Sequence, residues 1–420
     1  MPSDSVPVGI HDLTFRTTSL QLTHAELAGH TGVPLAKYHR GIGQKAMSIP
    51  APDEDVVTMA ADAAAAVVGR HGADRIRTLV FATETSIDQA KAGGLYVHSL
   101  LGLPPHIRVV ELKQACYGAT AALQFATALV HRDPDQQVLV LASDIARYDL
   151  DSPGEPTQGA AAAAFLVTAR PALLEIDTPS GVFTREVMDF WRPNYRTTAL
   201  VDGRASIDAY LHALTGAFGD YRRRGGATLR DIHTICYHQP FTRMAHKAHH
   251  HLLQQAGLPA GPQDIAAALA PTTTYNELLG NSYTASLYVA LAALLDSGTP
   301  LDGETVGLFS YGSGSVAEFL TATVRPGYRD HLRTEAHHAA VTDRRPVGYA
   351  AYRDLHGSGL PTDGSRYATA ASTPGPYRLA GIRDHRRLYE TNGPAAGPTA
   401  ATTGTATDRG VPGEGEGGGG

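Results

Sequence analysis

The chain has 420 residues, of which 43% are hydrophobic and 18% are charged, and its formal net charge is −6. A chain of this length and composition can bury a large core, built as one big domain or as two similar halves. The negative charge argues against nucleic acid as a general partner. The sequence has only two cysteines, Cys116 and Cys236, and shows neither a signal pattern nor an apolar run long enough to span a bilayer. We therefore expect a cytoplasmic protein without disulfides and without a membrane partner.

Apolar strands alternate with helices along the first part of the chain. We expect strands at 8–10, 78–83, 138–142 and 159–168, helices at 55–68 and 88–101, and a turn-rich loop at 38–44. The strand at 138–142 is expected to end at Ser143 and Asp144. Strands of continuous apolar character between helices are typical of an α/β protein with buried sheets.

One stretch in this part places a cysteine between a strand and a helix. β-Branched and apolar residues lead up to Leu112, and alanines at helical spacing follow Cys116 from Ala119 onward. The positive end of a helix dipole favours a thiolate, so Cys116 is a candidate nucleophile, assisted by the flexible Gly118. The alternative is a structural cysteine buried in a tight turn.

The second part of the chain repeats the alternation after a loop-rich segment at 176–204. We expect helices at 207–224, from Thr242 onward and at 281–295, and strands at 232–237, 305–310 and 316–324. The order of polar residues at strand ends and helix starts is the same as in the first part, which indicates an internal duplication. We predict an N-terminal half at 1–170, a C-terminal half at 171–390 and a disordered tail rich in Gly, Pro and Thr at 391–420.

Three reactive side chains occupy strand ends or helix starts in this scheme: Glu84, Cys116 and His238. In open α/β sheets, ligands bind at the carboxyl ends of strands, so the three can converge if the halves face one another. Individually, the glutamate could be a solvated loop residue and the histidine a helix cap. Asn281 holds the position in the second half that the cysteine holds in the first.

Two other sequence patterns give weaker evidence for a binding site. The glycine-rich turns at 41–43 and 311–314 lack the further residues of a dinucleotide or P-loop site, and they are better suited to direct N–H groups at an oxyanion. His246 and His250 are spaced for one helix face, but no carboxylate or cysteine lies at a suitable spacing. We therefore predict that no metal is bound.

Several motifs, taken jointly, resemble 3-hydroxy-3-methylglutaryl-CoA synthases. They are Phe-Ala-Thr-Glu-Thr-Ser-Ile-Asp around Glu84, Gln-Ala-Cys-Tyr-Gly-Ala-Thr-Ala-Ala around Cys116, Tyr-His-Gln-Pro-Phe-Thr-Arg-Met from Tyr237, Gly-Asn-Ser-Tyr-Thr-Ala-Ser around Asn281, Phe-Ser-Tyr-Gly-Ser-Gly-Ser around Ser313, and Asp-Phe-Trp-Arg-Pro-Asn-Tyr from Asp189, with Val-Asp-Gly beyond it. The resemblance runs in order from about Val8 to about Tyr389.

The resemblance implies a thiolase-like αβαβα sandwich of two pseudo-symmetric halves, usually a homodimer. It also implies a condensation of acetyl-CoA with acetoacetyl-CoA and water in the mevalonate pathway, without a cofactor. Acetyl-CoA acylates Cys116, Glu84 removes a methyl proton, and the carbanion attacks the ketone. Glu84 then protonates the alkoxide, and water releases the product. His238 contacts the acetoacetyl oxygen.

The same resemblance assigns the remaining site residues. Binding of substrate and CoA falls to Thr157, Ser206, Arg243, Lys247, Asn281 and Ser313. Supporting positions are Asp144, Tyr148, Asp189, Pro240 and Phe241. Arg243 departs from the lysine we expect in many relatives; it keeps the charge but forks two donors where a lysine offers one point charge.

Three other functions remain open from the sequence. A β-branching synthase of polyketide assembly uses the same chemistry on acyl carrier proteins, and the intact Asp189 and Val201 motifs argue for the mevalonate type instead. An initiating ketoacyl synthase needs no carboxylate base, so Glu84 argues against it. A thiolase-like protein without activity would not retain all three reactive side chains.

Overall fold

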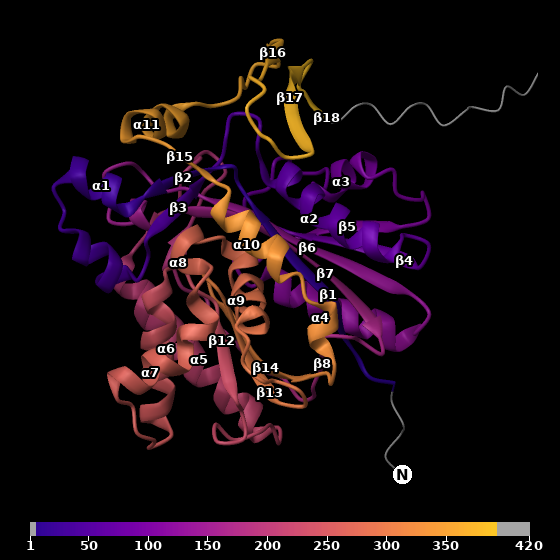
Figure 1. Cartoon of the computed structure of the whole chain (residues 1–420), viewed down its shortest axis with the longest axis vertical. Coiled ribbons are helices and arrows are strands. Elements are labelled where there is room, and N and C mark those ends of the chain that lie inside the picture. The colour runs from indigo at the N-terminus through magenta and orange to yellow at the C-terminus, as the bar shows by residue number, and fades with distance from the viewer. Residues whose placement is uncertain (1–5, 393–420) are drawn as a thin grey trace, which may run out of the picture.

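A ten-stranded sheet runs through the computed structural model, which describes residues 6–392 (Figure 1). Its strands are β1 (Val8–Thr17), β4 (Ile76–Ala82), β5 (Arg108–Leu112), β6 (Gln137–Ala146), β7 (Gly159–Ala169), β8 (Leu174–Ile176), β9 (Gly181–Thr184), β12 (Thr234–Tyr237), β13 (Thr305–Gly312) and β14 (Val316–Val324). Their order is β12-β13-β14-β8-β1-β7-β6-β4-β5, with β9 paired to β14. The short strand β8 joins the two halves, because it pairs with both β1 and β14.

The two halves repeat one pattern of strand pairing. In the first, β4 is parallel to β6, β6 antiparallel to β7 and β7 antiparallel to β1. In the second, β12 is parallel to β13, β13 antiparallel to β14 and β14 antiparallel to β9. The duplication expected from the sequence is therefore present in the backbone. Strand β5 extends the first half by one strand and forms an outer edge of the sheet.

Helices form three layers around the strands. Two of them, α4 (Gly118–Arg132) and α9 (Ser286–Asp296), share one core cluster with strands of both halves. Helices α2 (Val56–His71) and α3 (Gly94–Leu100) pack on the outer side of the first half. Helices α5 (Gly203–Arg223), α6 (Thr242–Gln255) and α7 (Pro262–Thr273) cover the second. Apolar strands covered on both faces require this arrangement, and the predicted αβαβα order is confirmed.

Four local predictions are wrong. Residues 38–44 include a π-helical turn (Lys37–Ile42) that ends at Gly43, where φ is +76°. Helix α3 begins at Gly94, because the carboxylate of Asp88 accepts the N–H groups of Ala90 and Lys91 and turns the chain. Strand β6 continues through Asp144 to Ala146. Helix α9 begins at Ser286, after a short helix α8 (Asn276–Leu279) and a 3₁₀ turn (Tyr283–Ala285), so Asn281 lies in a loop.

The last described part of the chain returns to the N-terminal half (Figure 1). It comprises a 3₁₀ turn (Tyr328–His331), α10 (Thr334–Thr342), β15 (Arg345–Pro346), α11 (Tyr349–Gly357), β16 (Tyr367–Ala368), β17 (Tyr377–Arg383) and β18 (Arg386–Thr391). Strand β15 pairs with β2 (Leu20–Thr23), which pairs with β3 (Ala46–Ile49) and leads into α1 (His24–Thr31). Arg378 forms an ion pair with the buried Asp53 at 3.1 Å. The division at residue 170 stays a prediction, and the predicted tail lies outside the described residues apart from Thr391 and Asn392.

Candidate active site

Glu84 and Cys116 lie together where two neighbouring strands end. Strands β4 and β5 are parallel and adjacent, so their carboxyl ends meet at one edge, two residues before Glu84 and four before Cys116. The thiol of Cys116 donates a hydrogen bond of 2.9 Å to Oε1 of Glu84. A soft nucleophile and a carboxylate are therefore in direct contact, which is the arrangement that acyl transfer and proton abstraction both need.

The turn that presents Cys116 is held against the second half of the molecule. Ala115 has a φ of +42°, a conformation rare for a residue with a side chain. A Cβ at Gly312 would lie 2.4 Å from the carbonyl oxygen of Gln114, so only glycine lets the two backbones approach this closely. The amide of Gln114 donates to the carbonyl of Ser313 at 3.2 Å. Ser313 therefore lies beside the cysteine turn, in the turn between β13 and β14.

The thiol is not ionised in the resting protein. Burial, followed by the charge of Glu84, raises the pKa of Cys116 well above its ordinary value. This corrects the prediction that the start of the following helix would favour a thiolate: Cys116 is 9% exposed, and the cost of burying its charge outweighs the helix dipole.

Glu84 also holds its proton more tightly than an ordinary carboxyl group. Burial, followed by the charge of Asp144, raises its pKa to about 8, while the thiol of Cys116 and the charge of Arg192 act to lower it. Near neutral pH the group therefore exists in both forms. A group that must serve first as a base and then as an acid needs this balance.

Asp144 fixes the segment that carries Glu84. Its Oδ1 accepts the hydroxyl of Thr83 at 2.7 Å, the N–H of Glu84 at 2.9 Å, and both the N–H (3.0 Å) and hydroxyl (2.6 Å) of Thr85. Its Oδ2 accepts the N–H and the hydroxyl of Thr284 from the second half. One buried carboxylate thus ties both halves together beneath the catalytic pair.

His238 and Asn281 come from the second half and are both buried. Burial lowers the pKa of His238 to about 3, so its ring is neutral, and its Nδ1 has no hydrogen-bond partner among the described residues. The hydroxyl of Tyr210 donates to the carbonyl of His238 at 2.7 Å, and burial raises the pKa of Tyr210. Oδ1 of Asn281 accepts the N–H of Tyr283 at 2.9 Å, and Tyr283 packs against Cys116.

A loop from Arg185 to Asp202 forms a wall of the site and includes β10 (Phe190–Trp191) and β11 (Leu200–Val201). Asp189 accepts the hydroxyl of Tyr311 at 2.6 Å and the N–H of Gly314 at 2.9 Å. Phe190 packs against the cluster that contains Cys116 and makes an edge contact with Tyr148, with ring centres 6.2 Å apart. Burial, followed by the proximity of Cys116 and Glu84, raises the pKa of Tyr148, which therefore lies near both.

The candidate CoA-binding residues are more scattered. Arg243 and Lys247 are exposed and lie one turn apart on α6, directly after the partly buried Pro240 and Phe241. Ser206 lies in the first turn of α5. Thr157, in a 3₁₀ turn (Glu155–Thr157), donates its hydroxyl to the carbonyl of Gly154 at 2.7 Å, and its own carbonyl accepts the N–H of Asn281 at 3.0 Å. In residues 6–392, no group of three or more His, Cys, Asp and Glu side chains is placed to hold a metal ion.

Sequence reasoning missed several residues that hold this site. Arg192 donates to the carbonyl of Glu84, and Thr83, Thr85 and Thr284 donate to Asp144. All four lie inside the motifs quoted above. The available signals were the two hydroxyls that flank the carboxylate in Thr-Glu-Thr and the arginine that follows the aromatic pair Phe-Trp.

A neutral buried cysteine hydrogen-bonded to a carboxylate, with a buried histidine and a buried asparagine in a pseudo-symmetric second half, is typical of a thiolase-like condensing enzyme. Comparison with known proteins narrows this class. The model of the hydroxymethylglutaryl-coenzyme A synthase N terminal matches residues 4–171, and that of the C terminal matches 175–267 and 262–343. The chain belongs to the hydroxymethylglutaryl-CoA synthase family.

Individual relatives agree with this assignment. The hydroxymethylglutaryl-CoA synthase of Enterococcus faecalis is 38% identical over 359 residues, which cover 85% of this chain and 93% of the relative. A polyketide biosynthesis 3-hydroxy-3-methylglutaryl-ACP synthase, PksG of Bacillus subtilis, is 31% identical over 86% of this chain and 91% of its own. The solved structure of MvaS in complex with 3-hydroxy-3-methylglutaryl coenzyme A superimposes with a TM-score of 0.84 at 38% identity, over 92% of this chain and 99% of that one.

Proposed function

We propose that this enzyme condenses acetyl-CoA with acetoacetyl-CoA and water to form 3-hydroxy-3-methylglutaryl-CoA and CoA, in the mevalonate route to isoprenoids. The observation that carries the proposal is the 2.9 Å hydrogen bond from the thiol of Cys116 to the carboxylate of Glu84. The relative from Enterococcus faecalis is called a synthase of this product, and MvaS is solved in complex with it.

In the first step, the sulfur of Cys116 attacks the acetyl carbonyl of acetyl-CoA. The thiol is neutral, so its proton must leave as the S–C bond forms, and Glu84 is the acceptor already in contact with it. Glu84 then passes this proton to the departing CoA thiolate. Cys116 carries an acetyl thioester, CoA leaves as a thiol, and Glu84 is again a carboxylate.

In the second step, Glu84 removes a proton from the acetyl methyl group, and the carbanion attacks the ketone of acetoacetyl-CoA. Glu84 returns its proton to the new alkoxide, and water hydrolyses the thioester to restore the thiol. The neutral ring of His238 donates a hydrogen bond to the ketone oxygen. This contact is favourable because the buried ring nitrogen Nδ1 otherwise has no hydrogen-bond partner among the described residues. Asn281 orients the same substrate, and the N–H groups of Cys116 and Ser313 stabilise the oxyanion.

The anionic part of CoA meets the exposed cations Arg243 and Lys247 on α6, with Ser206 and Thr157 as neutral contacts. All proton transfers are assigned to side chains of the chain itself, so we propose that the enzyme needs no metal and no further cofactor. Its two cysteines are free thiols and the nucleophile must stay reduced, which fits a cytoplasmic enzyme.

Mass spectrometry after mixing with acetyl-CoA tests the function. We expect an acetyl adduct on Cys116 that disappears when acetoacetyl-CoA is added, with the six-carbon product appearing. Cys116→Ser should lose the adduct, whereas Cys236→Ser, which changes a fully buried thiol in β12, should keep it. Absence of an adduct on the wild type would overturn the proposal.

A carrier-protein substrate is the second candidate, because PksG is named as a synthase that acts on an acyl carrier protein. Comparing free acetyl-CoA with an acetyl-loaded carrier protein in the same assay separates the two. Turnover with acetyl-CoA alone supports the mevalonate function. Turnover only with the carrier would reassign the enzyme.

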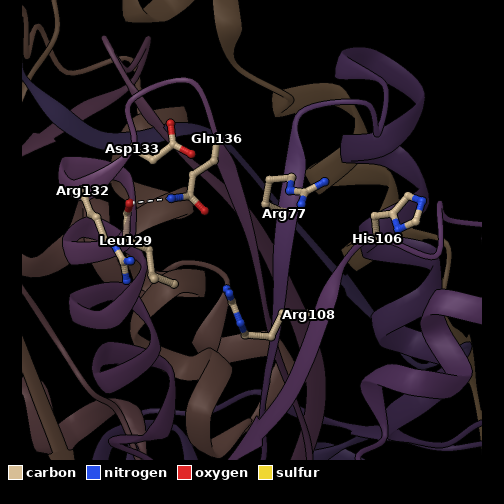
Figure 2. A pocket seen from close by; sticks show the side chains of 7 residues that line it. All are labelled: Arg77, His106, Arg108, Leu129, Arg132, Asp133 and Gln136. Atoms are coloured by element: carbon tan, nitrogen blue, oxygen red, sulfur yellow. Dashed lines mark hydrogen bonds between the residues drawn. The ribbon is translucent and has the colours of Figure 1, made fainter.

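We also propose a homodimer, formed by pairing β5 with its copy. Strand β5 is an outer edge, and unpaired edges bind further strands. Beside it, Val110 and Phe125 are 39% and 56% exposed. Next to them is a cavity of about 300 Å³, lined by Arg77, His106, Arg108, Leu129, Arg132, Asp133 and Gln136 (Figure 2). Figure 2 shows Arg108 on the strand side and Leu129 and Arg132 on helix α4 across from it.

Most of the charged side chains that line this cavity are cationic. In residues 6–392, neither Arg108 nor Arg132 forms an ion pair, and Arg108 donates only to the hydroxyl of Thr78. A second copy paired through β5 would cover the exposed side chains of Val110 and Phe125.

A further inference from the structure

We propose that Arg192 is a positioning residue for the condensation: its guanidinium group holds the Glu84 segment against Cys116 and keeps a positive charge beside the carboxylate. The proposal rests on the function proposed above. Arg192 touches no reacting atom, and its effect passes through Glu84.

The backbone of Glu84 is held from both sides. Its N–H donates to Asp144 of β6 at 2.9 Å, and its carbonyl oxygen accepts a hydrogen bond from the guanidinium group of Arg192. With both backbone groups bound, the side chain extends to the thiol of Cys116 at 2.9 Å. Loss of either anchor frees the peptide unit next to the catalytic carboxylate, and small displacements at this distance cost rate steeply.

The loop that carries Arg192 is fixed on both sides of it. Before it, Asp189 is bonded to Tyr311 and Gly314, and Phe190 packs on the Cys116 cluster. After it, Arg196 forms an ion pair with Asp149 at 2.8 Å. The backbone on either side of Arg192 is therefore bound to both halves of the molecule. These contacts hold the guanidinium group of Arg192 in place beside Glu84.

The charge of Arg192 offsets forces that keep Glu84 protonated. The charged and titratable groups that face Glu84 are Asp144 from β6, Cys116 after β5, Tyr148 after β6, Tyr283 before α9, and Arg192. Both tyrosines have a raised pKa and stay neutral, Asp144 raises the pKa of Glu84, and Arg192 lowers it. Without Arg192, burial and Asp144 raise the pKa of Glu84 further. A smaller fraction of Glu84 is then ionised at neutral pH and able to remove the methyl proton.

The test compares Arg192→Gln, Arg192→Lys and, as a matched control, Arg185→Gln, which changes an exposed arginine in the same loop. The condensation rate is measured from pH 6 to pH 10. For Arg192→Gln we expect the midpoint at which the rate rises with pH to move up by about one unit, and the rate at pH 7 to fall about tenfold or more. Arg192→Lys keeps the positive charge but loses the guanidinium group that donates to the carbonyl of Glu84. We therefore expect kcat to fall and the midpoint of the pH profile to remain at its wild-type value. Arg185→Gln should match the wild type.

A uniform loss of rate at every pH for Arg192→Gln, with an unmoved midpoint, would overturn the proposal, because that is the effect of a merely structural contact. If Arg192→Gln does not fold, Arg192→Lys decides alone: a kcat equal to that of the wild type would overturn the positioning role. Failure of the proposed function is distinguishable, because the wild type would then form no six-carbon product at any pH.

Discussion

The chemistry of this site depends on two side chains that each resist ionisation. The thiol of Cys116 and the carboxyl of Glu84 both have raised pKa values because both are buried, and they share a hydrogen bond. Such a pair titrates as a unit, so the pH profile of the enzyme reports the pair and its charged neighbours, Asp144 and Arg192. A neutral thiol is less reactive toward oxidants than a thiolate, because the thiolate is the nucleophilic form.

The buried histidine gives a prediction for stability. Burial lowers the pKa of His238 to about 3, whereas the ordinary value is 6.5. Between these values the unfolded chain binds a proton and the folded chain does not, so acid favours unfolding. We expect His238 to contribute a loss in the free energy of unfolding of up to about 1.4 kcal/mol per pH unit between pH 6 and pH 4.

Urea unfolding of the wild type and of His238→Gln across this range measures that contribution. The variant cannot take up the proton, so its free energy of unfolding should fall less steeply with acid. Equal slopes for the two proteins would contradict the buried neutral state of the ring. His249→Gln is a useful comparison, because burial lowers the pKa of His249 only to about 4.

At the scale of elements, strand ends could be located from the sequence, and the loops that complete the site could not. Apolar runs ending at Ala82 and Leu112 placed Glu84 and Cys116 correctly at one sheet edge. The start of α9 was wrong, because Gly280 and Tyr283 adopt φ values of +80° and +43° and hold Asn281 outside the helix. Contacts such as Arg192 to Glu84 join residues 108 positions apart, and no periodicity encodes them.

Gly280 yields a prediction about how the Asn281 loop is held. An alanine there would need a φ of +80°, and its Cβ would lie 1.9 Å from the carbonyl oxygen of Gln158. Gly298 is a matched control, since its φ is +79° and no atom lies within 4 Å of the place that an alanine methyl group would occupy. We expect Gly298→Ala to cost about 1 kcal/mol from backbone strain alone. Gly280→Ala should cost roughly 3 kcal/mol or more, since overpacking adds to the same strain.

Thermal unfolding of both variants gives the comparison, and the condensation assay adds a second readout. Gly280→Ala should lose activity beyond its loss of stability, because Asn281 follows the displaced peptide. Similar melting temperatures for the two variants would show that the 158–159 and 279–281 segments can separate without cost.

For the whole molecule, the site exists only where the two halves meet. Asp144 reaches Thr284 across the boundary, and Gln114 reaches Ser313. The middle layer of α4 and α9 packs against strands of both halves, so neither half of the sheet is covered without the other. The chain after Thr342 then returns to the first half through β15 and Arg378. We expect a single cooperative unfolding transition for this reason.

The outer edge at β5 provides the last prediction. If two copies pair there, Val110 and Phe125 lie in the interface, and charge at these positions is buried on association. We expect the wild type to sediment as a dimer at micromolar concentration, and Val110→Lys combined with Phe125→Glu to sediment as a monomer. Val182→Lys is the control, because Val182 is 52% exposed on β9, away from this edge. A wild type that sediments as a monomer, or a control that dissociates as the double variant does, would contradict pairing through β5.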